Sequence, residues 1–168
     1  MSSLVRLIER IVGGAGIFAA MLLVPLVFAT CYEVFSRYVM GEPTAWSYEI
    51  GYVLTGSHFL LALAYTLRAG EHIRIDIFSG KFSRRTRAVI DAAAYCVVVP
   101  LLIWVAVALL EYMVTGYLRN ERSGQSALNM PVWLFRTVYF LSLALFAMQA
   151  CAELLKSVAR IRGEATGG

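Results

Sequence analysis

Four uncharged, strongly apolar stretches constrain what this chain can fold into: Ile11–Tyr32, Ile50–Leu67, Ala92–Leu110 and Thr137–Ala152. An α-helix rises about 1.5 Å per residue, so roughly 20 apolar residues cross a hydrocarbon core about 30 Å thick. Three stretches approach that length, and the uncharged segment 123–135 lets the fourth helix begin before Arg136. The stretches are apolar on all sides, as expected of helices surrounded by lipid and by other helices. The sequence therefore predicts an all-α integral membrane protein with four transmembrane helices.

The composition agrees with a chain that is almost entirely membrane-embedded. Of the 168 residues, 60% are hydrophobic and only 15% are charged, well outside the usage of soluble domains. We predict a single four-helix membrane domain over residues 1–168, with spans near 11–36, 46–68, 86–114 and 132–155. The first stretch is longer than the apolar core of a signal peptide, about 7–15 residues, and is predicted to be retained. The loops are too short for a catalytic domain, so we predict that the chain is not an enzyme.

Basic residues predict the orientation in the membrane. Eleven of them lie in the amino-terminal segment, the loop between spans 2 and 3, and the carboxy-terminal tail: Arg6, Arg10, Arg68, Arg74, Lys81, Arg84, Arg85, Arg87, Lys156, Arg160 and Arg162. The opposite side holds four: Arg37, Arg119, Arg122 and Arg136. The positive-inside rule then places both termini in the cytoplasm. Because the basic residues flank membrane spans and lack interleaved stacking aromatics, we expect anionic lipid headgroups, and not nucleic acid, as their partner.

Small residues and prolines within the spans predict how the helices pack. Gly13, Gly14 and Gly16 give the first span a face that lets another backbone approach closely. A second such face in span 2 is formed by Gly51, Thr55 and Gly56. Pro25 and Pro100 are expected to bend spans 1 and 3.

Few ionisable residues lie within the spans. His58 is the one near mid-span, and it predicts a hydrogen bond to a neighbouring helix, with a proton relay as the alternative. Glu33 and Arg37 are four residues apart and so share a helix face. Glu49 lies at a similar depth one turn into span 2, and we expect an Arg37–Glu49 contact that pins the hairpin around Gly41.

The loop Glu71–Phe78 alternates polar and apolar residues. This pattern predicts a short amphipathic segment in the headgroup region between helices 2 and 3. His72 and Asp76 are four residues apart, but a third ligand is not close by, so we predict neither a metal site nor any other cofactor in this chain.

An ordered set of motifs resembles a known family. The set comprises Glu33-Val34-Phe35-Ser36-Arg37-Tyr38, Trp46-Ser47-Tyr48-Glu49, His72-Ile73-Arg74-Ile75-Asp76 and Ser126-Ala127-Leu128-Asn129-Met130-Pro131-Val132-Trp133. Together with the size and the four spans, these motifs are similar to the DctQ-type small membrane subunit of tripartite ATP-independent periplasmic (TRAP) transporters. The resemblance covers nearly the whole chain. The chain departs from it at Leu61–Ala64, where many members carry glycine, and at Tyr139-Phe140, where many carry a Pro-Gly-like element.

The resemblance implies a function. Such a subunit pairs with a large multi-span membrane subunit, which holds the substrate and sodium sites and moves as an elevator. A periplasmic binding protein delivers organic acids such as C4-dicarboxylates or sialic acid, and the sodium gradient drives uptake across the bacterial inner membrane. The small subunit is then a scaffold that helps to form the docking surface.

The resemblance also suggests interface residues. Arg37, Trp46 and Glu49 are candidates on the outer side, and His72 and Asp76 on the inner side, each with a purely structural role as the alternative. The outer loop adds Arg119, Glu121 and Arg122 as candidate contacts with the binding protein.

Two alternatives come from other classes of membrane protein. A membrane-anchor subunit of a respiratory complex usually needs paired haem-ligating histidines at matching depths, whereas this chain has His58 in a span and His72 in a loop. A small stand-alone multidrug exporter needs a central acidic residue, whereas Glu33 and Glu49 lie near the outer edge of the spans.

Overall fold

The computed structural model describes residues 3–70 and 84–163 as helices joined by short loops. Four helical segments are long and apolar enough to cross a membrane: Ser3–Met40, Ser47–Ala69, Thr86–Leu118 and Trp133–Ile161. This confirms the predicted all-α fold with four membrane-spanning helices. His72, Asp76 and the predicted amphipathic segment lie outside the described residues.

The first segment is interrupted about three turns into its apolar stretch. It consists of α1 (Ser3–Met21), α2 (Leu23–Phe35) and a π-helical turn, η1 (Ser36–Met40). Pro25 lacks a backbone N–H, and its ring crowds the carbonyl of the residue four positions earlier, Met21. The break at Leu22 follows from this clash and confirms the expected distortion at Pro25. By contrast, the helix that contains Pro100 continues through it.

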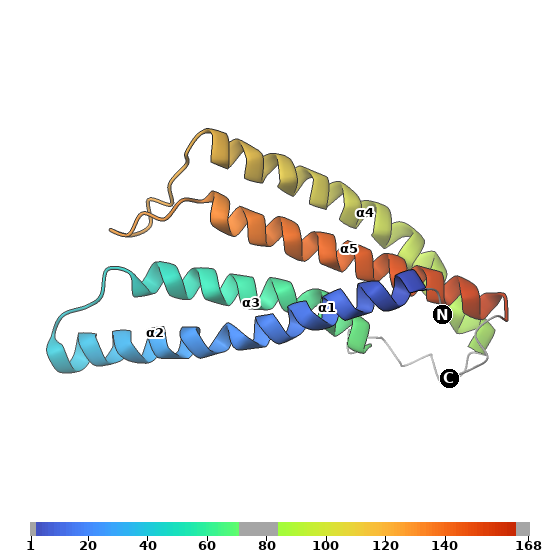
Figure 1. Cartoon of the computed structure of the whole chain (residues 1–168), viewed down its shortest axis with the longest axis horizontal. Coiled ribbons are helices and arrows are strands. Elements are labelled where there is room, and N and C mark those ends of the chain that lie inside the picture. The colour runs from blue at the N-terminus through green and yellow to red at the C-terminus, as the bar shows by residue number, and fades with distance from the viewer. Residues whose placement is uncertain (1–2, 71–83, 164–168) are drawn as a thin grey trace.

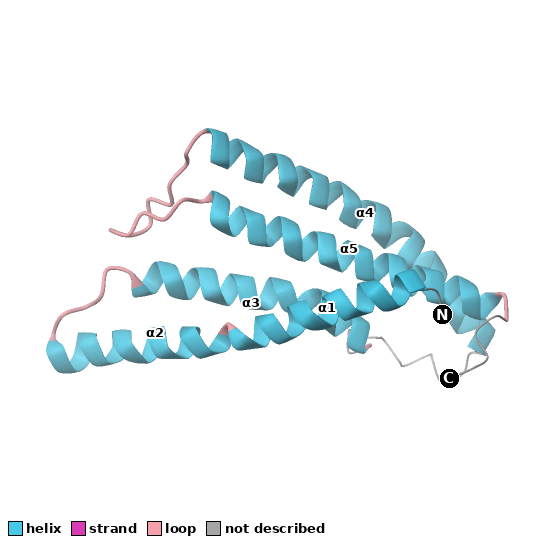
Figure 2. Ribbon diagram, in the orientation of Figure 1, coloured by secondary structure: helices cyan, strands magenta, loops and turns pink. Residues whose placement is uncertain are grey.

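The five α-helices among the described residues form two hairpins that pack against each other. In Figure 1, α1 and α2 form one arm with α3 (Ser47–Ala69), and α4 (Arg84–Leu118) forms the other with α5 (Trp133–Ile161). The helices α3 and α5 run parallel and pack together, α4 packs mainly on α5, and α1 and α2 pack on α3, with α1 also in contact with α5. We call the end that holds both chain termini the terminal end, and the opposite end the loop end; the two long pink connections on the left of Figure 2 mark the loop end.

Glycine brings α1 close to α3. A side chain at Gly13 would collide with the guanidinium of Arg68, and a Cβ at Gly16 would lie 2.5 Å from the ring of Tyr65. One turn beyond, His58 Nδ1 donates to the carbonyl of Ala19 across the same seam, at 2.9 Å. The predicted small-residue contact is thus confirmed for Gly13 and Gly16, and so is the predicted hydrogen bond of His58.

Replacing Gly16 with alanine is expected to separate α1 from α3. The new methyl group meets the first atoms of the Tyr65 side chain, which cannot swing aside freely, so overpacking should lower the free energy of unfolding by about 1–3 kcal/mol. Gly14→Ala is the matched control because nothing lies within 4 Å of its Cβ position. Denaturation in mixed micelles, followed by helical circular dichroism, compares the two; equal stabilities would contradict the close contact.

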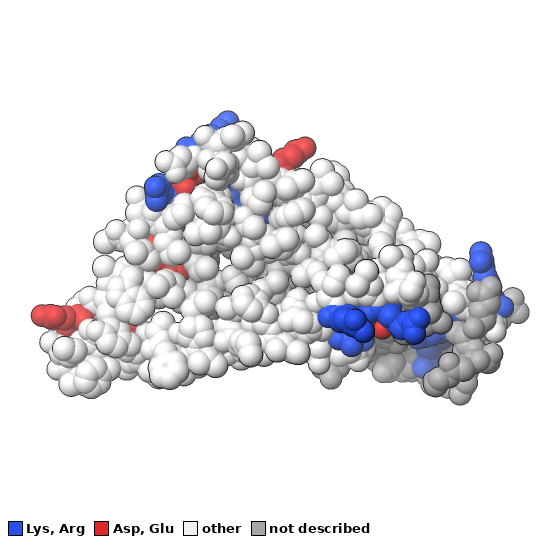
Figure 3. Space-filling model, viewed as in Figure 1, with Lys and Arg blue, Asp and Glu red and all other residues white. Residues whose placement is uncertain are grey.

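The buried residues of the bundle are mostly small, and the large apolar ones point outward. The core around Leu67, Val99 and Ala150 is completed by partly buried neighbours from α4 and α5. On α2 and α4, in contrast, Phe28 and Trp104 expose about seven-tenths of their surface, at 72% and 70%. Figure 3 shows the same division, with uncharged atoms over the length of the bundle and charges gathered toward its ends. These outer faces are surfaces for lipid or for helices of another chain.

Candidate interaction site

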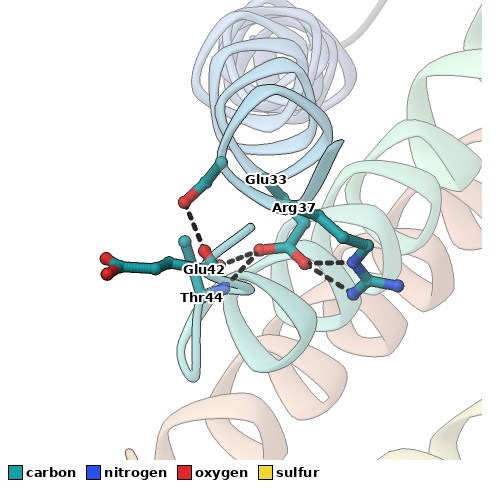
Figure 4. A network of polar contacts seen from close by, with 5 residues as sticks. Glu33, Arg37, Glu42 and Thr44 are labelled. Atoms are coloured by element: carbon teal, nitrogen blue, oxygen red, sulfur yellow. Dashed lines mark hydrogen bonds and ion pairs between the residues drawn. The ribbon is translucent and has the colours of Figure 1, made fainter. Parts of the chain in front are cut away.

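Three groups of polar residues hold the loop end together. The first is the α2–α3 clasp, formed by Glu33, Arg37 and Thr44 (Figure 4). Arg37 donates to Glu33 Oε1 from Nε at 2.9 Å and from Nη2 at 2.5 Å. The other carboxylate oxygen accepts the Thr44 backbone N–H at 2.9 Å and the Thr44 hydroxyl. One carboxylate therefore joins the last turns of the first segment to the chain entering α3.

The connection between α2 and α3 is shaped by its own turn chemistry. Gly41 ends η1 with a φ of +74°, a conformation that costs glycine little. The hydroxyl of Ser36 donates to the carbonyl of Glu42 at 2.5 Å. Trp46 precedes α3 and stacks on Tyr32, with ring centroids 5.8 Å apart. The indole thus packs against its own chain at the loop end.

The second group is the α3–loop clasp, centred on Glu49. Its side chain is almost fully buried at 1% exposure. One carboxylate oxygen accepts the Ser123 hydroxyl and, at 3.1 Å, the backbone N–H of Met130; the other accepts the Ser126 hydroxyl. Charge-assisted hydrogen bonds of this kind are about twice as strong as neutral ones. They fix the loop between α4 and α5 over the start of α3.

The predicted Arg37–Glu49 contact is wrong. Arg37 pairs with Glu33, four residues earlier on the same face, and this contact requires no other element to be in place. Glu49 is turned toward the loop that returns from α4, and hydroxyl and N–H groups satisfy its charge there. The hairpin is instead closed by Glu33 and Thr44.

The third group is the α4–α5 clasp, formed by Arg136, Tyr112 and Glu121. Arg136 is buried, with 9% of its side chain exposed, and Nη2 lies 2.7 Å from a carboxylate oxygen of Glu121. Nη1 donates to the Tyr112 carbonyl at 3.1 Å, and the guanidinium carbon lies 3.5 Å from the centre of the Tyr112 ring. Gly116 leaves the space for this guanidinium, because a side chain there would collide with it.

The loop between α4 and α5 is also held by hydrogen bonds within itself. Ser123 N–H donates to the Met130 carbonyl at 2.9 Å, and Arg122 and Pro131 form an isolated antiparallel bridge. Asn120, Gly124 and Asn129 reverse the chain with positive φ angles.

The candidate residues of this loop fall into two kinds. Arg119 and Arg122 are exposed, whereas Glu121 is engaged by Arg136. The loop therefore presents two cations to the medium.

Several residues of these clasps were not among the sequence candidates. Ser123 and Ser126 were overlooked as partners of Glu49, although a carboxylate one turn into an apolar span needs donors from elsewhere. The distribution of basic residues places Arg136 on the outer side and does not indicate that its side chain is buried. The signal for its burial was Gly116 on the preceding helix, at a depth that matches the start of α5. The arrangement stabilises helices and a loop: Glu33 and Arg136 form ion pairs, and Glu49 accepts hydrogen bonds from neutral groups of the same chain.

These features define a four-helix membrane subunit whose buried charges hold its own helices together. The family model described as "Tripartite ATP-independent periplasmic transporters, DctQ component" matches residues 26–160. The chain belongs to this family and is a small membrane subunit of a TRAP transporter, as its motifs predicted. No curated protein matches it at a significant level. Family membership implies partnership with a large TRAP membrane subunit and a binding protein.

Proposed function

We propose that this chain is the stationary, non-catalytic scaffold of a sodium-driven, binding-protein-dependent transporter for organic acids such as C4-dicarboxylates or sialic acid. The large membrane subunit carries the substrate and sodium sites and moves, while this chain holds its fixed part against lipid. Both termini face the cytoplasm of a bacterial cell, and the loop end faces the periplasm. The chain itself needs no cofactor.

One observation carries the proposal: the charged side chains near the loop end that are withdrawn from solvent hold the subunit together. Glu33 joins α2 to α3, Glu49 joins α3 to the following loop, and Arg136 joins α5 to α4. A charge that is already ion-paired or hydrogen-bonded to fixed partners is suited to rigidity, because releasing it inside a membrane is costly. A rigid frame with broad apolar outer faces is what a moving neighbour requires.

The loop between α4 and α5 supports a second part of the proposal. Arg119 and Arg122 are exposed on a loop that Glu49 ties to α3, so both cations are presented from a fixed position. A binding protein with an acidic surface would be attracted to them, and rim charges of this kind mainly change association rates.

The test is to measure substrate uptake by the complete transporter after α3 and α5 of this subunit have been crosslinked, so that they cannot move relative to each other. Cysteines replace Tyr52 and Tyr139, whose hydroxyls lie 3.3 Å apart between α3 and α5, in a chain whose own cysteines are replaced by alanine. A short bifunctional thiol reagent then bridges the two helices. Proteoliposomes with the cognate large subunit and binding protein should take up the carboxylate at an unchanged rate after bridging. Loss of uptake on bridging, or uptake by this chain alone, would overturn the scaffold proposal.

A further inference from the structure

Arginines gather at the terminal end of α1 and α3 without an acidic counterpart of their own. Arg6 and Arg10 on α1 and Arg68 on α3 are all exposed, and none of them forms an ion pair with another described residue. Figure 3 shows basic side chains collected over this end of α1. A concentration of positive charge at one place on a membrane helix attracts an anion from outside the chain.

The helix geometry puts the three guanidinium groups on one seam. Arg68 lies over Gly13, whose missing side chain gives it room. Successive residues of an α-helix are rotated by about 100° around the helix axis. Viewed along that axis, Arg6 is therefore about 20° from Gly13, and Arg10 is about 60° from it. Along the helix, Arg6 lies about two turns from Gly13 and Arg10 about one turn, both toward the terminal end. The three side chains therefore border the same strip of surface.

The nearest carboxylate on α1 is already engaged. Glu9 pairs with Lys156 on α5 at 2.5 Å, and Lys156 also pairs with Glu153 at 2.8 Å. Glu9 therefore does not neutralise the arginines. Like charges spaced four apart on a helix destabilise it slightly, so a bound anion between Arg6 and Arg10 would be favoured twice, by attraction and by relief of repulsion.

An exposed apolar track continues from the arginines along the same face of α1. Ile17 and Met21 expose 63% and 64% of their surface, and both lie on the side of α1 that bears Arg10. A ligand that matches this surface has a phosphate at one end and a hydrocarbon chain at the other. We propose that α1 and α3 bind an anionic phospholipid here, with its phosphate held by Arg6, Arg10 and Arg68 and an acyl chain along Ile17 and Met21. This inference is independent of the proposed transport function.

Native mass spectrometry of the full chain in micelles tests the site, with phosphatidylglycerol as the probe and phosphatidylcholine of the same acyl chains as the comparison. Phosphatidylglycerol should bind more tightly. The double variant Arg6→Gln/Arg10→Gln should weaken its binding by more than about tenfold. The matched control is Arg160→Gln/Arg162→Gln, which removes two exposed arginines from the same end of the bundle but from α5 and its C-cap. It should bind like the unmodified chain.

Two further measurements complete the test. Arg68→Gln alone should weaken lipid binding while leaving helical circular dichroism unchanged, which covers the case in which the double variant folds poorly. Inorganic phosphate at millimolar concentration should not displace the lipid, because it lacks the chain that packs on α1. Equal binding of both lipids, equal loss in the α5 control, or full displacement by phosphate would overturn the proposal.

Discussion

Replacement of Glu49 by alanine is expected to release the loop between α4 and α5 from α3. The change removes the acceptor for two hydroxyls and for the Met130 N–H at once. The freed donors are close enough to the loop end to find water, so the helices should remain while the loop opens. Regions that open locally become accessible to proteases in proportion to the open population.

Trypsin measures that opening directly, because it cleaves after arginine and the loop carries two exposed arginines, Arg119 and Arg122. Cleavage after Arg122 should be about tenfold faster in Glu49→Ala than in the unmodified chain, as expected where cleavage follows the open population. Glu49→Gln should fall between the two, since its single amide oxygen replaces only part of the carboxylate. The helical circular dichroism of both variants should be unchanged.

Glu42→Ala is the matched control for Glu49. It removes a carboxylate from the same end of the molecule, and Figure 4 shows this carboxylate pointing away from Glu33 and Thr44. The loop in Glu42→Ala should be cleaved at the rate of the unmodified chain. If Glu49→Ala were cleaved no faster than the unmodified chain, the loop would be held by contacts other than those of Glu49.

The second large effect is expected at the α4–α5 clasp. Glu121→Gln leaves the buried guanidinium of Arg136 without its counter-charge and should lower the free energy of unfolding by about 2 kcal/mol. That is less than the cost for a fully buried pair, because 33% of the Glu121 side chain is exposed. Arg136→Met should cost about as much, since it removes the Tyr112 hydrogen bond and the contact with the ring.

A double-mutant cycle in mixed micelles separates this pair from general packing. Once Arg136 is methionine, Glu121 has no charge left to neutralise. The double variant should therefore be more stable than the sum of the single costs implies. Additive costs would mean that the two residues act independently. Arg119→Gln is the control, because it removes an exposed arginine of the same loop and should leave stability unchanged.

Local features of the fold could be predicted from the sequence, because they depend on residues that are near one another in the chain. Hydropathy located the four helices, and the missing N–H of Pro25 explains the break at Leu22. The spacing of Glu33 and Arg37 placed both on one helix face, and the structure shows that they form an ion pair there. The glycines of α1 indicated a close helix contact, and the structure identifies α3 as the partner.

The long-range contacts could not be predicted in the same way. The partners of Glu49 lie more than seventy residues away, in a loop whose position depends on how the two hairpins pack. Depth alone suggested Arg37 as the partner, and depth does not say on which side of the helix a carboxylate lies. The burial of Arg136 likewise depends on Gly116 facing it across the α4–α5 contact.

The central claim is that this chain works as the fixed partner of a larger membrane subunit. The most direct measurement is co-expression of the chain, carrying an affinity tag, with its cognate large membrane subunit, followed by purification in mild detergent and native mass spectrometry. The account predicts a stable complex with one copy of each subunit. Purification of this chain without any multi-span partner would contradict it.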